Sequence, residues 1–213
     1  MPGPAIKICG ISTPETLGAV IAAQADYVGF NFHVPSPRYV SLAQAQVLGA
    51  QAQGQVQRVG LFVDAPNQAL AEAVATGALD ALQLHGDESP ARVAELRGRF
   101  GLPVWKVIGV ASRADLDRAQ HYVGAADFLL LDARTPAGGL PGGLGLKFDW
   151  TLLSGWKAPL PWGLAGGLNP ANVAAAIALT GAPLVDAASG VESAKGVKDT
   201  GLIAAFCAAA RAA

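Results

Sequence analysis

Two stretches near the end of the chain share one pattern: WGLAGGLNPAN at residues 162–172 and VDAASGVE at residues 185–192. Each is a short apolar run that ends at glycine and then meets a polar residue able to begin a helix. Glycine lets the backbone take positive φ and come close to a ligand, and the free N–H groups of a following helix attract anions. The pair predicts strand-to-helix turns that hold one phosphate, with plain structural turns as the alternative.

Composition indicates a folded protein with no nucleic-acid-binding surface. The chain has 213 residues, of which 52% are hydrophobic and 15% charged, and its net charge is −1. This length suits a single domain, residues 1–213, and nucleic acid is not an expected partner. The most apolar region, residues 171–188, is broken by polar residues, proline and glycine, so no membrane association is expected. With two cysteines and no apolar segment typical of a signal peptide, a cytoplasmic location is expected.

The rest of the chain repeats the same unit, an apolar strand followed by a helix. The strands are continuous apolar runs, which is typical of a parallel sheet covered by helices. Predicted strands cover residues 5–9, 26–32, 57–63, 78–84, 104–108, 127–131, 160–165 and 183–186. Predicted helices cover residues 14–23, 42–53, 66–76, 90–100, 113–122, 170–179 and 200–211, with a short helix at most at 148–153.

Eight such units in strict alternation predict an α/β fold, a single (β/α)8 TIM barrel. An open doubly wound sheet is the alternative, but no GxGxxG sequence follows the first strand. In a barrel, polar residues at the carboxyl ends of strands belong to the active site. The residues at the predicted strand ends are Cys9, Asn31, Asp64, His85, Gly109, Asp132, Gly166 and Asp186.

Two strand-end residues can carry acid–base chemistry. Cys9 is expected to face the barrel mouth, where its thiolate can take up a proton; the alternative is a small buried hydrophobic residue, as expected for Cys207. Asp132 follows four apolar residues, so its carboxyl can stay protonated and act as an acid. It could instead cap the next turn or pair with Arg134. Only one histidine, His85, lies at a strand end, so no metal site is expected.

Two loops carry further candidates. Arg38 follows the second strand, and its guanidinium can bind a carboxylate through two hydrogen bonds or be merely solvated. Residues 133–147 are rich in glycine, so a lid that orders over a ligand is expected, with a disordered surface insert as the alternative.

Eight short motifs follow one another along the chain: KICGI at 7–11, SPRYVS at 36–41, VGLFVD at 59–64, QLHGDE at 83–88, LLLDA at 129–133, FDW at 148–150, LAGGLNPANV at 164–173 and SGVESAKGVKD at 189–199. Taken together and in this order, they resemble the phosphoribosylanthranilate isomerase family. The resemblance implies a (β/α)8-barrel isomerase of tryptophan biosynthesis that performs an Amadori rearrangement on a phosphorylated small molecule, with no cofactor and no metal. The oligomeric state stays open between monomer and homodimer.

On matching positions, the resemblance implies roles for particular residues. Cys9 matches the general base, and Asp132 matches the general acid. Arg38 matches the residue that meets the anthranilate carboxylate, while His85 and Asp186 match residues that line the mouth and bind substrate. The implied phosphate site consists of Gly166, Gly167, Ser189 and Gly190.

Two positions depart from the family pattern. Leu144 stands where a hydroxyl residue is usual in a GGTG sequence, and Ala188 stands where serine is usual in SSG. Neither change touches Cys9 or Asp132, so we expect an active enzyme with altered substrate affinity. The alternatives are the related isomerase of the histidine pathway, which typically has an aspartate in place of Cys9, a metal-dependent epimerase, and a barrel that only binds a phosphorylated ligand.

Overall fold

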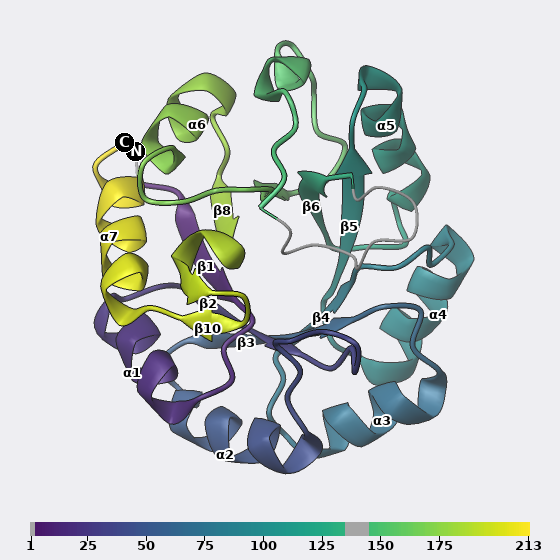
Figure 1. The fold of residues 1–213 in the computed structure, drawn as a ribbon. Coiled ribbons are helices and arrows are strands. Elements are labelled where there is room, and N and C mark those ends of the chain that lie inside the picture. Colours follow the sequence, from purple (N-terminus) through teal and green to yellow (C-terminus); the bar gives the residue numbers. More distant parts are fainter. Residues whose placement is uncertain (1–2, 135–144) are drawn as a thin grey trace.

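The computed structural model is a closed barrel of eight parallel strands with helices around its outside (Figure 1). It describes residues 3–134 and 145–213. Because β1 pairs with both β2 and β8, the (β/α)8 prediction is confirmed and the open-sheet alternative is wrong. The barrel strands are β1 (Ala5–Cys9), β2 (Tyr27–Asn31), β3 (Gln57–Phe62), β4 (Ala81–Leu84), β5 (Val104–Val110), β6 (Phe128–Ala133), β7 (Trp162–Leu164) and β8 (Leu184–Ala187).

Helices of the described residues follow the strands as the capping signals predict. Thr13, Ser41, Ser89 and Asp199 each accept a hydrogen bond from a backbone N–H of the first turn of their helix. The α-helices are α1 (Pro14–Ala22), α2 (Leu42–Ala52), α3 (Asn67–Ala75), α4 (Pro90–Phe100), α5 (Arg113–Asp117), α6 (Val173–Thr180) and α7 (Thr200–Arg211), and the 3-10 helices are η1 (Arg118–Tyr122), η2 (Trp150–Leu153) and η3 (Ser189–Val191).

Several boundaries differ from the prediction. The helix expected at 113–122 is α5 followed by the 3-10 helix η1, and α6 begins at Val173 and not at Pro170. β4 begins at Ala81, later than its apolar run suggests. Residues 78 and 79 belong to that run and are buried, but they precede the strand. Residues 189–198 form η3 and a hairpin of β9 (Glu192–Ala194) and β10 (Val197–Lys198), which the sequence did not predict.

Side chains of each barrel strand alternate between two cores. Ile6 and Ile8 of β1 point outward and belong to the large core between the barrel and the helices. Lys7 and Cys9, on the opposite face of the same strand, therefore point into the barrel. A smaller core fills the barrel interior and consists of Val59, Ala81, Trp105, Val107, Leu130, Ala165 and Leu184.

Aromatic rings close the amino-terminal end of the barrel. The ring of Trp105 lies 4.4 Å from that of Phe128 and 5.0 Å from that of Tyr27, measured between centroids. All three residues lie in the first half of their strands. The interior is therefore packed at this end, and the polar side chains gather at the other.

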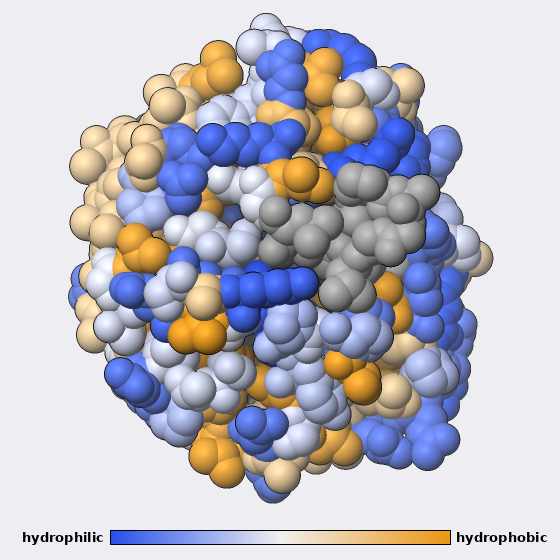
Figure 2. All heavy atoms as spheres, viewed as in Figure 1, coloured by the Kyte–Doolittle hydropathy of each residue, from blue (hydrophilic) through white to orange (hydrophobic). Residues whose placement is uncertain are grey.

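The face seen in Figure 2 mixes hydrophilic and hydrophobic residues, with mildly hydrophobic residues gathered over the alanine-rich helices α6 and α7. None of the helices that the structure describes is both long and apolar enough to cross a membrane.

Candidate active site

Cys9 ends β1 and is buried beside an ion pair. Its neighbour two residues earlier on the same face, Lys7, lies opposite Asp186 in the β1–β8 register. The Lys7 ammonium is completely buried and contacts the Asp186 carboxylate at 3.0 Å. The charge of Lys7 also acts on the side chain of Cys9. Gly29 on β2 leaves room for this thiol, because a Cβ there would lie 2.8 Å from Cys9 Sγ.

The pKa values of Lys7 and Cys9 follow from burial and from the charges around them. Burial is the largest single effect and lowers the pKa of Lys7, but the Asp186 carboxylate and the Cys9 side chain together outweigh it, so the pKa of Lys7 is raised and its ammonium stays charged. Burial raises the pKa of the Cys9 thiol, and the ammonium groups of Lys7 and Lys198 oppose that rise. The thiol at the mouth therefore depends on nearby cations for any thiolate it forms.

Asp132 lies in β6 with each carboxylate oxygen in a defined place. Its Oδ1 accepts a hydrogen bond of 2.7 Å from the N–H of Ala133, and its Oδ2 lies 3.4 Å from Nε2 of His85. The alternative pairing with Arg134 is wrong, because Arg134 pairs with Asp115. His85 follows β4, and its buried Nδ1 has no hydrogen-bond partner among the described residues.

Arg38 is buried and binds a carboxylate, which rules out the alternative of a merely solvated arginine. Its Nε and Nη2 donate to the two oxygens of Glu192 at 2.6 and 2.8 Å. Lys198, on β10, donates to the same carboxylate at 2.7 Å and to the carbonyl of Ala188 at 2.7 Å. Burial is the largest single effect and raises the pKa of Glu192, but the hydrogen bonds and positive charges of these donors together outweigh it and lower that pKa to about 2. The carboxylate thus ties the β9–β10 hairpin to the loop after β2.

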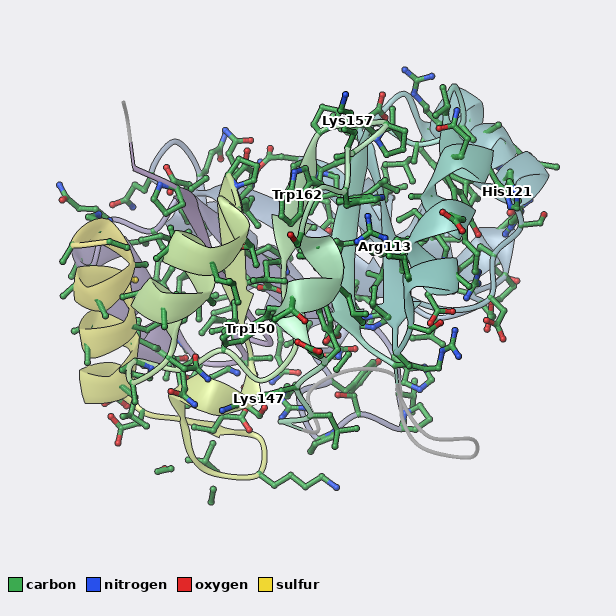
Figure 3. The ribbon with its side chains drawn as sticks, turned by 90° about the horizontal axis from the view of Figure 1, so that it is seen from above. Arg113, His121, Lys147, Trp150, Lys157 and Trp162 are labelled. Atoms are coloured by element: carbon green, nitrogen blue, oxygen red, sulfur yellow. The ribbon has the colours of Figure 1, made fainter. Side chains whose placement is uncertain are left out.

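The two glycine turns of the sequence meet in space. Gly166 and Gly167 have φ of +84° and +65°, a region that favours glycine. A Cβ on Gly190 would collide with the backbone of Leu168, so the turn after β8 packs directly on the turn after β7. Lys147 packs on Gly167 and lies at the same end of the barrel as the β9–β10 hairpin, whereas Lys157 lies at the opposite end (Figure 3).

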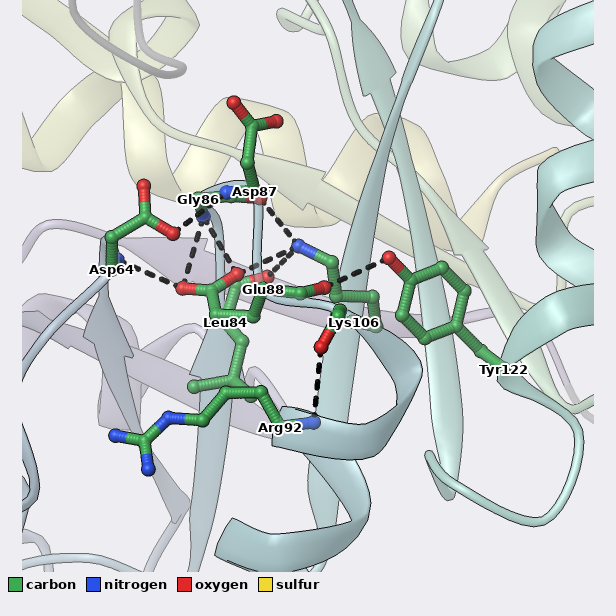
Figure 4. Close-up of polar contacts among 9 residues, drawn as sticks. Asp64, Leu84, Gly86, Asp87, Glu88, Arg92, Lys106 and Tyr122 are labelled. Atoms are coloured by element: carbon green, nitrogen blue, oxygen red, sulfur yellow. Dashed lines mark hydrogen bonds and ion pairs between the residues drawn. The ribbon is translucent and has the colours of Figure 1, made fainter.

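A buried network fixes the loop that carries His85 (Figure 4). Lys106 of β5 donates to the carboxylate of Glu88 at 2.8 Å and to the carbonyl of Gly86 at 2.6 Å. Glu88 in turn accepts from the backbone N–H groups of Asp64 and Gly86. The network leaves little freedom at the turn after β4, so His85 keeps its position beside Asp132.

A cavity of about 280 Å³ is lined by His85 and by Ala133, the residue that follows Asp132. Asp64 and Arg134 also line it. The volume is enough to hold part of a small ligand beside the ring of His85.

Most residues singled out in the sequence lie around one mouth, but three neighbours were not foreseen. Lys7, Glu192 and Lys198 are all buried, and each makes an ion pair with or beside a candidate residue. The sequence did contain a signal for these residues. Lys7 stands inside an apolar strand and Glu192 follows a glycine turn, and a charged side chain that is buried in such a place needs a partner of opposite charge. Cys207 lies in the core, as expected.

Two expectations concern metals and the glycine-rich loop. Among residues 3–134 and 145–213, no three His, Cys, Asp or Glu side chains are grouped so that they could hold a metal ion. The predicted lid at 133–147 and the departure at Leu144 lie largely or wholly outside the described residues.

Fold and geometry together define a class: a (β/α)8-barrel protein whose ionisable side chains converge at the carboxyl ends of its strands. Residues 6–209 match the sequence profile of N-(5'-phosphoribosyl)anthranilate (PRA) isomerase. The chain is 52% identical over 208 residues to the N-(5'-phosphoribosyl)anthranilate isomerase of Paramagnetospirillum magneticum, covering 97% of this chain and 96% of the relative. It is 51% identical over 212 residues to that of Cereibacter sphaeroides, covering 99% and 100%.

Solved structures agree with the sequence relatives. The phosphoribosyl anthranilate isomerase of Thermotoga maritima superposes with a TM-score of 0.88 at 34% identity, covering 99% of this chain and all 100% of the other. A phosphoribosyl anthranilate isomerase in complex with reduced 1-(o-carboxyphenylamino)-1-deoxyribulose 5-phosphate has a TM-score of 0.86 at 32% identity, with coverage of 99% and 100%. The chain therefore belongs to the N-(5'-phosphoribosyl)anthranilate isomerase family and is an enzyme of tryptophan biosynthesis.

Proposed function

We propose that the chain converts N-(5'-phosphoribosyl)anthranilate to 1-(2-carboxyphenylamino)-1-deoxyribulose 5-phosphate, with Asp132 as the general acid and Cys9 as the general base. One observation supports this most: the two residues end strands on either side of β7 and β8, whose glycine turns pack together. A substrate anchored by its phosphate at those turns has its sugar between the carboxyl and the thiol. The product-like ligand of the related complex has the same phosphate and carboxyphenyl ends.

The reaction needs two proton transfers on opposite sides of the sugar. Asp132 gives its proton to the furanose oxygen, the bond from that oxygen to C1′ breaks, and the nitrogen lone pair forms a protonated imine. The imine acidifies the C–H bond at C2′, so the Cys9 thiolate can remove that proton and leave an enolamine. Transfer of a proton to C1′ and loss of the hydroxyl proton at C2′ give the ketose, so atoms and charge balance.

Asp132 is well placed for the first step. Its Oδ1 is held by the N–H of Ala133, while Oδ2 lies beside Nε2 of His85, a residue that lines the cavity. Fixing one oxygen aims the other, which reduces the loss of rotational freedom when the acid meets its target. We assign His85 to the substrate-binding set, because its ring borders both the carboxyl and the cavity.

Arg38 and the glycine turns are assigned to the two ends of the substrate. Arg38 pairs with Glu192, but Lys198 shares that carboxylate, so the trio keeps one net positive charge for the anthranilate carboxylate. The phosphate is bound by backbone N–H groups of Gly166, Gly167, Ser189 and Gly190. Ala188 has no side-chain hydroxyl and adds no side-chain hydrogen bond. Asp186 uses Oδ1 for Lys7 and can accept a sugar hydroxyl at Oδ2.

Turnover of phosphoribosylanthranilate, followed by loss of its fluorescence, tests the assignment. We expect Cys9→Ala and Asp132→Asn each to lower kcat by about 10²-fold or more, the range for losing a general acid or base. Cys207→Ala is the control, because that thiol lies in the outer core. If the wild type binds a product analogue without turning over substrate, the barrel only binds its ligand; if Cys9→Ala keeps the wild-type kcat, the base is another group.

A further inference from the structure

Lys7 is a buried charge that the acid–base scheme does not use. Its side chain is 0% exposed, and a charge so deeply buried is costly unless it is paired. The pairing carboxylate, Asp186, lies opposite it on β8 and not on the neighbouring β2. A hydrophobic side chain would fill an inward position of β1 at lower cost, so the retained ammonium calls for a role.

Lys7 lies where it acts on the thiol of Cys9. Both side chains leave β1 on the inner face, two residues apart, so they lie next to each other along the strand. The Asp186 carboxylate holds the ammonium at 3.0 Å and fixes its position. The ammonium is therefore a fixed positive charge on the same inner face as the sulfur, in a buried part of the barrel where charges act more strongly on each other than in water.

We propose that Lys7 is the positioning residue of the base: its ammonium, held by Asp186, stabilises the thiolate of Cys9. This inference rests on the proposed role of Cys9. In the step it serves, the S–H bond breaks, its electron pair stays on sulfur, and the proton leaves to solvent. The thiolate formed in this way beside Lys7 then takes the C2′ proton of the substrate.

The pKa of the Cys9 thiol depends on charged groups from several elements of the barrel. Lys7 on β1 and Lys198 on β10 favour the thiolate, Asp186 on β8 disfavours it, and β2 offers only the uncharged Gly29. Arg38, in the loop after β2, packs its side chain against Gly10, and its charge is paired with the carboxylate of Glu192. Of the two ammonium groups, Lys7 lowers the pKa of the Cys9 thiol more than Lys198 does.

The thiolate of Cys9 can be titrated directly by its ultraviolet absorbance. Cys207→Ala serves as the background, and the same protein with Cys9→Ala supplies the spectrum to subtract. In this background Lys7→Met is expected to raise the apparent pKa of the Cys9 thiol by at least about one unit, a tenfold smaller thiolate fraction. Asp186→Asn is expected to shift it in the opposite direction, because it removes the carboxylate that disfavours the thiolate.

A second buried pair of the barrel provides matched controls. Lys106 is 1% exposed and pairs with Glu88 at 2.8 Å, so Lys106→Met and Glu88→Gln remove a similar pair from a different part of the barrel (Figure 4). Neither group contributes to the charge balance at Cys9. We expect both controls to leave the thiol pKa unchanged although they lower the melting temperature.

The outcomes separate this inference from the proposed reaction. If Lys7→Met and Lys106→Met shift the pKa of the Cys9 thiol equally, the shift reflects a general loss of packing in the barrel, and the proposal is overturned. If Lys7→Met does not fold, Lys7→Gln and Lys7→Arg decide: a thiol pKa that is raised in Lys7→Gln and kept near the wild-type value in Lys7→Arg supports the proposal, and an unchanged pKa in Lys7→Gln overturns it. The role of Cys9 as the base fails independently if Cys9→Ala keeps turnover, whatever the titration shows.

Discussion

Glu192 is the residue that holds most of the mouth together. Its carboxylate accepts from Nε and Nη2 of Arg38, from Nζ of Lys198 and from the N–H of Gly196, at 2.6 to 3.0 Å. Charge-assisted hydrogen bonds of this kind favour the ionised form, so its pKa falls from 4.5 to about 2. At acidic pH, the folded protein therefore binds fewer protons at this carboxyl than the unfolded chain does.

This difference predicts how Glu192 shapes acid stability. Because its folded pKa is depressed, its contribution is fully present above the unfolded value near 4.5 and is lost as the pH falls toward 2. Between about pH 6 and about pH 3 the wild type is expected to lose roughly 2 kcal/mol more than Glu192→Gln does. Urea unfolding at both pH values measures this. Equal losses in the two proteins would show that the carboxyl is not selectively stabilised in the folded state.

Individual partners are the part of the site that sequence reasoning reaches least well. Cys9 and Asp132 follow from their position at strand ends, because a parallel barrel collects such residues at one mouth. The contact between Lys7 and Asp186 spans 179 residues and depends on the closing register of β1 with β8. A strand pattern does not state that register, so the pair could be found only once the barrel was closed.

At the scale of elements, the turn after β7, which belongs to the proposed phosphate site, is tightly packed. A Cβ on Gly167 would lie 2.8 Å from the carbonyl oxygen of Leu146 and 2.9 Å from that of Gly145, in addition to the strain of its positive φ. Gly181, which ends α6, has nearly the same φ of +64° with open space around it. The two glycines thus share one backbone strain and differ only in crowding.

We expect Gly167→Ala to raise KM by about tenfold, since the displaced turn no longer aims its N–H groups at the phosphate; tenfold corresponds to about 1.4 kcal/mol. Gly181→Ala is expected to cost about 1 kcal/mol of stability through left-handed strain while leaving KM unchanged. Steady-state kinetics and thermal melts on both variants test this. A KM change of the same size in both variants would mean that the turn after β7 has no special part in binding.

Helices and strands were predictable where local chemistry decides them. Thr13, Ser41, Ser89 and Asp199 cap their helices through their own side chains, so their starts could be placed within a residue. The β9–β10 hairpin could not be placed, because it consists of short, partly exposed strands without an apolar pattern. The hairpin is held to the rest of the barrel by the ion pair of Glu192 with Arg38, a tertiary contact that no local pattern shows.

Across the whole molecule, the barrel separates a packed end from a reactive end. Tyr27, Trp105 and Phe128 fill the amino-terminal end, while buried charges gather at the carboxyl end. Residues at the first end are expected to determine stability, and those at the second end to determine chemistry. Every strand runs from one end to the other, so a substitution at the packed end tests whether packing there affects catalysis at the mouth.

Trp105→Ala tests that independence. Trp105 is 5% exposed and contacts both other rings, so its removal leaves a cavity and is expected to cost about 3–5 kcal/mol of unfolding free energy. Well below its melting temperature the variant should keep kcat and KM within about twofold, because rigid strands transmit little of a relaxed cavity to the mouth. Trp105→Phe keeps a ring against Phe128 and is expected to lose less stability. A folded Trp105→Ala protein with kcat reduced as strongly as Asp132→Asn would mean that the two ends are coupled, and that packing at the base of the barrel sets the geometry of the acid.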